Sequence, residues 1–311
     1  MKLLSWNARG LGNPRGIYAL SELIRKEDLE VLFLQETKLN TTKMEFCRIK
    51  MKFYGCFNVE SVGRSGGLTI LWKPDVHLTI LSYSKSHIDA KIESLLHSWF
   101  LTGIYGHPDT NKCIETWNLI RSMKRDPLEP WLVFDDFNEI LSNEEKWGGC
   151  DRPRQQLESF QQMFFDCELR DLGFKGPHYT WNNGRYDSAQ IFERLERFTG
   201  NASWCQLFSE ATVTHGSTAY SDHQPIWVQL YGAHQTPKGP KPFHFESMRI
   251  GEKACTDIIL DNWSDSSPQG LDNIMENIRC CSNQLQSWNV SKFEVQVQVQ
   301  VQLSNAKTKL A

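Results

Sequence analysis

Short polar clusters follow apolar runs at several points in the first 231 residues. They combine carboxylates, amides, a phenol and an imidazole, which are side chains that hold cations and move protons. Because strands of packed sheets present their ends along one rim, such clusters can meet in one cleft. The clusters are Ser5-Trp6-Asn7, Gln35-Glu36-Thr37, Gly103-Ile104-Tyr105-Gly106, Asp135-Asp136-Phe137-Asn138, Thr180-Trp181-Asn182, Arg194-Leu195-Glu196-Arg197 and Ser221-Asp222-His223.

This set of side chains suits the hydrolysis of a phosphate ester. A carboxylate can hold Mg²⁺, and the ion neutralises charge on the phosphate. A second acid can orient or deprotonate the attacking water, while amide and imidazole donors stabilise the charge of the transition state. Each cluster alone also fits a helix cap, a turn or a surface ion pair, so the prediction rests on their combination.

The sequence favours this chemistry over two other hydrolytic sites. Residues 63–67 read Gly-Arg-Ser-Gly-Gly, the G-x-S-x-G pattern of serine hydrolases. That motif leads from a strand into a helix, whereas here the β-rich run 68–72 follows, so we predict a turn. No two of the nine His lie at helical i, i+4 spacing beside a Glu, which argues against a zinc hydrolase.

The elements predicted to position the clusters form a strand-rich α/β body. Helical spacing of apolar residues predicts helices between the first two strands, at 111–123 and at 154–167. Nine strands with few helices favour a four-layer α/β sandwich, in which two packed, mostly antiparallel sheets are flanked by helices. The predicted strands are 2–7, 30–36, 67–73, 76–83, 88–94, 98–105, 131–136, 190–196 and 226–231.

The composition changes after residue 231, which we take as the end of a first domain, 1–231. Residues 232–245 are rich in Pro, Gly and Lys and predict a linker. Residues 246–311 predict a helical tail, because apolar residues at 271–288 recur at steps of three and four. The VQ repeat at 295–302 has the period of a strand and an aggregation-prone composition, and we assign it no function.

The charge balance excludes a protein that holds nucleic acid through bulk charge alone. Lys and Arg number 34 against 37 Asp and Glu, a net charge of −3, so phosphate contacts must be local. Nine Cys without a C-x-x-C pair fit a reducing compartment. Without a signal peptide or a run of 18 apolar residues, we expect a soluble, intracellular protein with no membrane partner and no evident obligate protein partner.

In this order the clusters resemble the endonuclease/exonuclease/phosphatase family, the metal-dependent phosphodiesterases related to deoxyribonuclease I and abasic-site endonucleases. The resemblance covers about 1–231 and is closest to the N-terminal endonuclease of plant non-LTR retrotransposon polyproteins. The tail resembles the segment that joins this endonuclease to a reverse transcriptase, and without a Tyr-x-Asp-Asp-like motif the chain resembles a truncated copy. The motifs are SWNARGLG, FLQETK, SGGLTILW, YGHP, DFN, YTWNN, RLER and SDHQPI.

The resemblance implies an Mg²⁺-dependent endonuclease, with Mn²⁺ as a substitute ion. The implied metal ligands are Glu36, Asn7 and, nearby, Asp222. The implied catalytic residues are Asp136, which would orient or activate the water, Asn138 and Tyr105 at the phosphate, and His223, which would donate to the phosphoryl oxygen beside Glu196.

The same resemblance implies that the partner is DNA, nicked with little sequence readout in the nucleus. The residues expected to shape a DNA-facing loop are Thr180, Trp181 and Asn182, although Trp181 also fits a core position. Arg9 and Arg185 are candidate contacts to the DNA backbone.

Two positions depart from the family's usual pattern. Asp135 stands where Gly is common, and we expect its carboxylate to repel the DNA phosphate or draw the metal from its ligands. Glu196 stands where Asp is usual, and its extra methylene is expected to displace His223. We therefore expect weak activity, which Asp135→Gly and Glu196→Asp together should raise.

Two alternatives remain open at this point. A phosphoesterase of the same fold could act on a lipid, an inositol or poly(A), because a fold does not determine its substrate. A catalytically dead retrotransposon remnant would also explain the two departures and the missing polymerase.

Overall fold

The computed structural model describes residues 1–61, 66–94, 97–185, 187–218, 220–231, 253–263 and 271–289. The chain divides into two compact units, Met1–His234 and Gln235–Ala311, and each is considered by itself. The turn predicted at 63–67 lies mostly outside the described residues, as do the linker at 232–245 and the VQ repeat. Among the described helices, none has the length and apolar character needed to cross a bilayer.

The first unit contains two six-stranded sheets and a small third sheet. In the first sheet β1 and β2 run parallel and the other neighbours antiparallel; the order is β14 (Thr212–His215), β15 (Ile226–Gln229), β1 (Lys2–Asn7), β2 (Val31–Gln35), β4 (Leu68–Trp72), β3 (Gly55–Val59). In the second sheet β7 and β8 are the parallel pair; the order is β10 (Arg170–Asp171), β13 (Glu196–Gly200), β8 (Trp131–Asp136), β7 (Ser98–Tyr105), β6 (His87–Glu93), β5 (His77–Ser84). The third sheet consists of β11 (Trp181–Asn182), β12 (Phe192–Glu193) and β9 (Lys146–Trp147).

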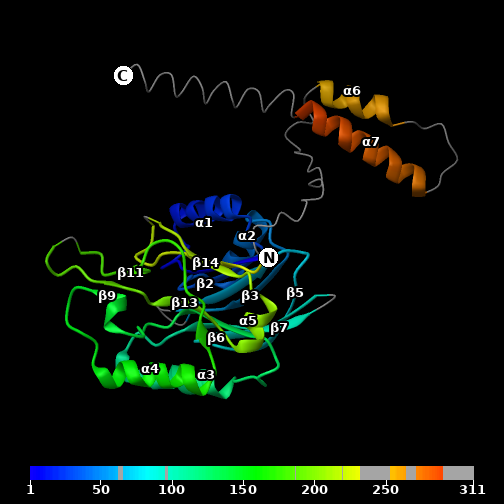
Figure 1. Ribbon diagram of the computed structural model, residues 1–311. Coiled ribbons are helices and arrows are strands. Elements are labelled where there is room, and N and C mark those ends of the chain that lie inside the picture. The colour runs from blue at the N-terminus through cyan, green and yellow to red at the C-terminus, as the bar shows by residue number, and fades with distance from the viewer. Residues whose placement is uncertain are drawn as a thin grey trace. The chain divides into compact units, whose positions relative to one another are not determined.

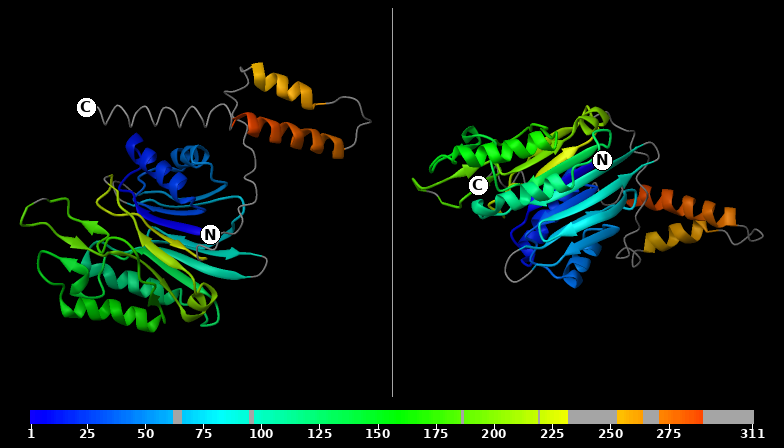
Figure 2. Two further views of the ribbon diagram at one scale, coloured as in Figure 1. Left: turned by 45° about the horizontal axis from the view of Figure 1, so that its top comes forward. Right: turned by 90° about the horizontal axis from the view of Figure 1, so that it is seen from below.

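Helices cover the outer faces of both large sheets, which makes four layers (Figure 1). On the first sheet lie α1 (Pro14–Glu27) and α2 (Thr41–Lys50), and on the second α3 (Cys113–Ser122) and α4 (Arg154–Asp166). Figure 2 shows the same layering from two further directions. Because α1 and α3 each connect two parallel neighbouring strands, they are the crossover connections that such pairs require. Short helices complete the unit: η1 (Thr110–Lys112), η2 (Asn143–Glu145) and α5 (Ala202–Leu207).

Strand alternation sends side chains of each sheet into two different cores. On β1, Leu3 packs between the sheets, whereas Leu4 and Trp6 pack beneath α1 and α2. Phe33 of β2 and Phe134 of β8 meet edge to face between the sheets, with ring centroids 5.3 Å apart. This packing brings the ends of strands from different sheets close together.

The predicted α/β sandwich is confirmed, with one strand misplaced. The strand predicted at 190–196 is two strands: β12 ends at Glu193, and β13 begins at Glu196. Between them the amide of Arg194 donates to the Glu145 carbonyl and that of Leu195 to the Thr180 hydroxyl, so these residues leave the ladder. The sequence patterns also missed β3, β9, β10, β11, β14, α2 and α5.

The described part of the second unit is a pair of helices, α6 (Lys253–Asn262) and α7 (Leu271–Asn289). Cys255, Cys281 and Leu285 are buried, and the Cys281 thiol contacts the Ile259 carbonyl across the pair. The apolar spacing of 271–288 thus corresponds to a helix whose later turns pack on α6.

Candidate active site

The two parallel strand pairs place the predicted site residues at one rim. β1 and β2 end together at Asn7 and Gln35, and β7 and β8 end together at Tyr105 and Asp136. Glu36 follows β2 directly. Contacts then cross between the sheets: the Tyr105 hydroxyl donates to Glu36 at 2.7 Å, and the Asn7 amide donates to Asp136 at 3.2 Å.

The backbone at this rim adopts an uncommon conformation. Arg9, Glu36, Asp135 and Asn138 all have positive φ values, of 46°, 44°, 112° and 53°. For residues other than Gly this region is disfavoured by about 1–3 kcal/mol each, and it persists where surrounding contacts hold it. Such strain collects at functional sites.

Glu36 is an anionic oxygen donor in a partly closed environment. Its Oε1 accepts from Tyr105 and, at 3.4 Å, from the Asn7 amide, and its side chain is only 13% exposed. Burial alone would raise the pKa of Glu36, but the Tyr105 hydrogen bond and the Arg9 charge lower it below its usual value. An ionised carboxylate with a neighbouring amide oxygen is a donor set that Mg²⁺ prefers.

Asp136 is fully buried and held at both oxygens. Oδ1 accepts from the Asn138 backbone amide at 2.9 Å, and Oδ2 accepts from Asn7. Burial raises the pKa of Asp136, and the nearby Glu196 carboxylate raises it further. The group is therefore tuned toward accepting a proton near neutral pH. Asn138 itself is fixed by a side-chain bond to the Gly106 carbonyl, at 2.8 Å.

His223 is oriented by its neighbours. Its Nδ1 contacts Glu196 Oε1 and lies 3.7 Å from Asp136 Oδ2, while the Trp6 indole donates to its carbonyl at 3.1 Å. Burial lowers the pKa of the imidazole, but the Glu196 and Asp136 carboxylates outweigh burial and raise the pKa to about 9. His223 is thus a charged donor at neutral pH, with Nε2 as the ring nitrogen left for a substrate.

The longer acid at position 196 keeps its contact with the imidazole. Glu196 opens β13 directly opposite Asp136, and its side chain reaches His223 although Oε2 has no partner among the described residues. The ligand atoms of Asp136, Glu196 and His223 lie within 4.8 Å of one another, but a charged imidazole cannot ligate a cation, so this cluster suits proton transfer better than metal binding.

Asp135 precedes Asp136 at the end of β8 and contacts the other large sheet. Its side chain is fully buried against the Ser5 hydroxyl, and Oδ2 has no partner in the part of the chain that the structure describes. Burial and the charges of Asp136 and Glu196 hold the pKa of Asp135 well above its usual range. The backbone at Asp135 has a positive φ, so this residue carries strain in addition to the cost of a buried carboxyl group.

We expect Asp135→Gly to raise the free energy of unfolding by about 1–3 kcal/mol, because Gly adopts positive φ without strain. Urea denaturation of the full chain measures the change. Asp135→Ala is the matched control, since it removes the carboxyl but keeps a side chain at this φ, and should gain less. A less stable Asp135→Gly protein would contradict the assignment of strain.

The residues predicted to face DNA divide into two groups. Thr180 is fully buried, and its hydroxyl accepts from the amides of Leu195 and Glu196 at 2.9 and 3.2 Å. It positions the chain before β13, so it would shape the neighbouring loop from its buried side. Trp181 is half-buried and donates to Asp222 at 3.2 Å, whereas Arg185 is exposed in the β11–β12 loop.

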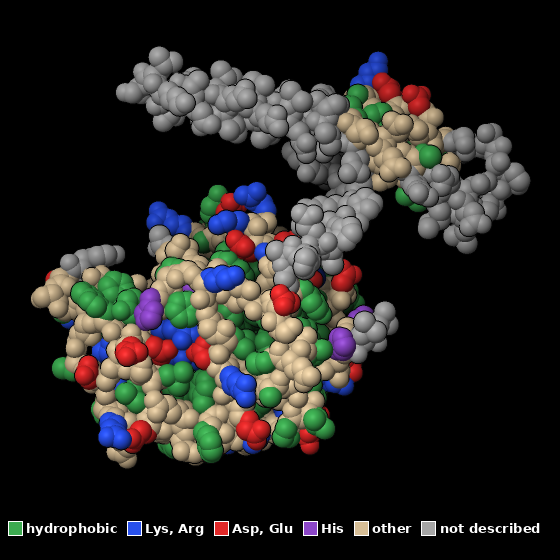
Figure 3. All heavy atoms as spheres, in the orientation of Figure 1, with side chains coloured by type: hydrophobic (Ala, Val, Ile, Leu, Met, Phe, Trp, Pro, Cys, Tyr) green, Lys and Arg blue, Asp and Glu red, His purple; other side chains and the backbone are tan. Residues whose placement is uncertain are grey.

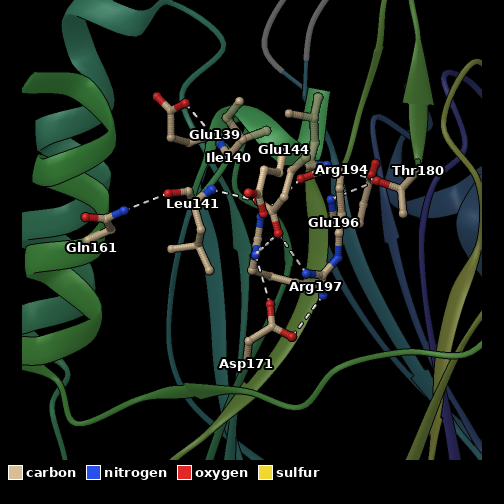
Figure 4. Close-up of polar contacts among 12 residues, drawn as sticks. Glu139, Ile140, Leu141, Glu144, Gln161, Asp171, Thr180, Arg194, Glu196 and Arg197 are labelled. Carbon is tan, nitrogen blue, oxygen red and sulfur yellow. Dashed lines mark hydrogen bonds and ion pairs between the residues drawn. The ribbon is translucent and has the colours of Figure 1, made fainter. Parts of the chain in front are cut away.

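A buried ion network that the sequence patterns did not reveal supports this side of the site. Arg197, with no exposed surface, donates to Glu145 and Asp171, and Arg194 donates to the same two acids (Figure 4). Figure 4 also shows Thr180 and Glu196 beside the two arginines. The RLER motif was the only sequence feature that pointed to the two arginines. Their partner acids lie 23 to 52 residues away in sequence.

Two mixed sheets packed face to face between helices, with carboxylates and an imidazole at one rim, define the class of α/β-sandwich nucleases and phosphatases. The chain belongs to the Endonuclease/Exonuclease/phosphatase family, whose profile matches residues 4–223. Members of this family are typically hydrolytic enzymes that use a divalent metal. A comparison with curated proteins finds no significant match.

Solved structures with the same fold include nucleases and a phosphatase. The endonuclease domain of TRAS1, a telomere-specific non-LTR retrotransposon, aligns at 12% identity with a TM-score of 0.56, over 74% of this chain and 97% of that one. The AP endonuclease LMAP from Leishmania major aligns at 16% identity and TM-score 0.62, over 74% and 87%. The 3' phosphatase NExo from Neisseria, bound to a product DNA hairpin, aligns at 17% and 0.55, over 74% and 99%.

Proposed function

We propose that the protein is an Mg²⁺-dependent endonuclease that nicks DNA. The observation that carries this proposal is the meeting of two acid groups at one rim: Glu36 with Asn7 and Tyr105, and Asp136 with Glu196 and His223. The two groups differ in charge state, since the pKa of Glu36 is lowered and that of Asp136 is raised. Such a division suits one acid to hold a cation and the other to move a proton.

Glu36, Asn7 and Asp222 are the residues that would hold Mg²⁺, and Mn²⁺ would substitute. The donor set fits: Glu36 is ionised, and Asp222 has a buried oxygen, Oδ1, without a partner among the described residues. When bound, the ion neutralises charge on the phosphate.

The other residues act on the water and the phosphate. Asp136 orients the attacking water and accepts its proton, held in place by Asn7 and the Asn138 amide. His223, charged and aligned by Glu196, donates to the phosphoryl oxygen as negative charge develops there. Tyr105 fixes Glu36 through its hydroxyl and lies beside the phosphate position.

DNA is the proposed substrate, and a nuclear location follows from it. Trp181 and Asn182 place a loop next to Asp222, because the Asn182 amide donates to the Asp222 carbonyl at 3.1 Å. The proposed phosphate contacts are Arg185, in the exposed part of this loop, and Arg9, which contacts Asp222. The TRAS1 and NExo structures, named for a retrotransposon and a DNA complex, support a nucleic-acid substrate.

Nicking of supercoiled plasmid by the full chain tests this function. We expect nicked circles with Mg²⁺ and none with EDTA, and an activity loss of at least about 100-fold in Glu36→Gln, because the chief metal ligand is gone. Glu22→Gln, which changes an exposed acid of α1, is the matched control and should behave as the unaltered protein. A folded protein that neither nicks DNA nor gains melting temperature with Mg²⁺ would indicate a dead remnant.

The charge distribution favours a second candidate, a phosphoesterase of the same fold whose substrate is a lipid, an inositol or poly(A). The net charge is −3, and acidic and basic side chains are interspersed on the face shown in Figure 3. A DNA binder makes several phosphate contacts, so its affinity falls steeply with salt. Affinity for a DNA duplex that hardly changes with salt would therefore favour a lipid or an inositol substrate, because poly(A) is itself a polyanion.

A further inference from the structure

The Arg9 guanidinium lies between two carboxylates assigned to the metal site. Its Nη1 is 3.0 Å from Asp222 Oδ2, and its Nε is 3.9 Å from Glu36 Oε2. The Arg9 side chain is 50% exposed, so this cation lies at the mouth of the site rather than inside the core. A cation already present between these acids is in competition with any divalent ion that approaches them.

The backbone holds Arg9 in this position. The Ala8 amide donates to the Gln35 carbonyl at 3.1 Å and the Leu11 amide to the Thr37 carbonyl at 3.0 Å. The Tyr220 hydroxyl closes the loop by donating to the Gly10 carbonyl at 2.6 Å. The base of the side chain is therefore fixed against the segment that carries Glu36, while the half-exposed side chain leaves the guanidinium open to solvent.

The other hydrogen-bond partner of Asp222 explains why Arg9 can compete with a divalent ion for this carboxylate and can also leave it. Oδ2 accepts from Arg9 and from the Trp181 indole at 3.2 Å, so it stays hydrogen-bonded when the guanidinium leaves. Glu36 also has a second cation, Lys38, at 3.8 Å. Neither acid depends on Arg9 alone for compensation in the metal-free protein.

We propose that Arg9 competes with the divalent ion for Glu36 and Asp222, and that it moves to a substrate phosphate when the ion binds. This inference rests on the proposed function and deepens it. Arg9 thereby links the binding of the metal to the binding of DNA. It weakens the binding of the metal alone and strengthens the binding of DNA to the metal-loaded protein. A residue with a merely structural role would change both affinities in the same direction.

Two affinities of the full chain test the proposal. Calorimetric titration with Mn²⁺ alone is expected to show about tenfold tighter binding in Arg9→Gln, because a neighbouring positive charge is removed. In an Asp136→Asn background with Mn²⁺, Arg9→Gln is expected to bind a DNA duplex more weakly, with a salt slope lower by about one. Arg9→Lys retains the charge and should stay close to the unaltered protein in both measurements.

Arg25→Gln is the matched control, because it removes an exposed arginine that pairs with Glu22 on α1. Tighter Mn²⁺ binding together with weaker DNA binding, confined to Arg9→Gln, supports the proposal, and any other combination overturns it. If the unaltered protein binds no Mn²⁺, the proposed metal-dependent function fails as well. If it binds Mn²⁺ and Arg9→Gln binds it no more tightly, the inference about Arg9 alone fails.

Discussion

Asp136→Asn is expected to lower the plasmid-nicking rate by about 10²–10⁴-fold, the range for loss of a positioned general base. Asparagine keeps the shape of the side chain and can still accept from the Asn138 amide through Oδ1, but its Nδ2 cannot accept from Asn7 and it takes no proton from water. The measurement is the initial rate of nicking with Mg²⁺, with the melting temperature recorded to show that the variant is folded.

The pH profile of the unaltered protein separates this role from a structural one. Burial and the Glu196 charge raise the pKa of Asp136 to about 7, so the rate should rise with pH through this region as Asp136 ionises. It should fall above about pH 9, where His223 loses its proton. Asp75→Asn, at an exposed turn, is the control, and its rate should show both the rise and the fall with pH. A rate in Asp136→Asn within a few-fold of the unaltered protein would contradict the assignment.

Arg197→Met is expected to lower the free energy of unfolding by about 3–5 kcal/mol, the range for breaking a buried ion pair. Arg197 has no exposed surface, and its guanidinium contacts Glu145 at 2.8 Å and Asp171 at 2.9 Å. Methionine fills most of the space of the arginine side chain, but it leaves Glu145 and Asp171 with less positive charge beside them in a mostly buried site. Urea denaturation of the full chain measures the loss.

Arg121→Met provides a control with similar geometry but more solvent. Arg121 contacts Asp166 at 2.7 Å, and the two side chains are 28% and 35% exposed. Water compensates the charge left behind there, so we expect a change of about 1 kcal/mol or less. Equal losses in the two variants would show that burial does not set the strength of the Arg197 network. Because Thr180 and Glu196 lie beside these arginines (Figure 4), the Arg197 variant should also nick DNA more slowly.

The amount of the fold that the sequence predicts depends on how each strand is buried. β1, β2, β7 and β8 are continuous apolar runs, because sheet and helices cover both of their faces, and their predicted bounds agree closely with the structure. β3 was missed because all five of its residues are only partly buried and its pattern is mixed. The break at 194–195 was missed because no Gly or Pro interrupts Phe192 to Phe198, although tertiary hydrogen bonds divide the segment.

By itself, the sequence determined the family and the candidate residues: which residue types follow which strands, in an order that resembles metal-dependent phosphodiesterases. It also determined the candidate acids, since Glu36 and Asp136 directly follow or end buried strands. Only the tertiary structure decided what each side chain contacts. Asp135 contacts Ser5 at a positive φ, Thr180 is buried against the chain before β13, and the loop after β1 sets Arg9 between Glu36 and Asp222. The physical reason is that residue spacing specifies the period and end of a strand, whereas side-chain direction and pKa depend on neighbours brought in from distant segments.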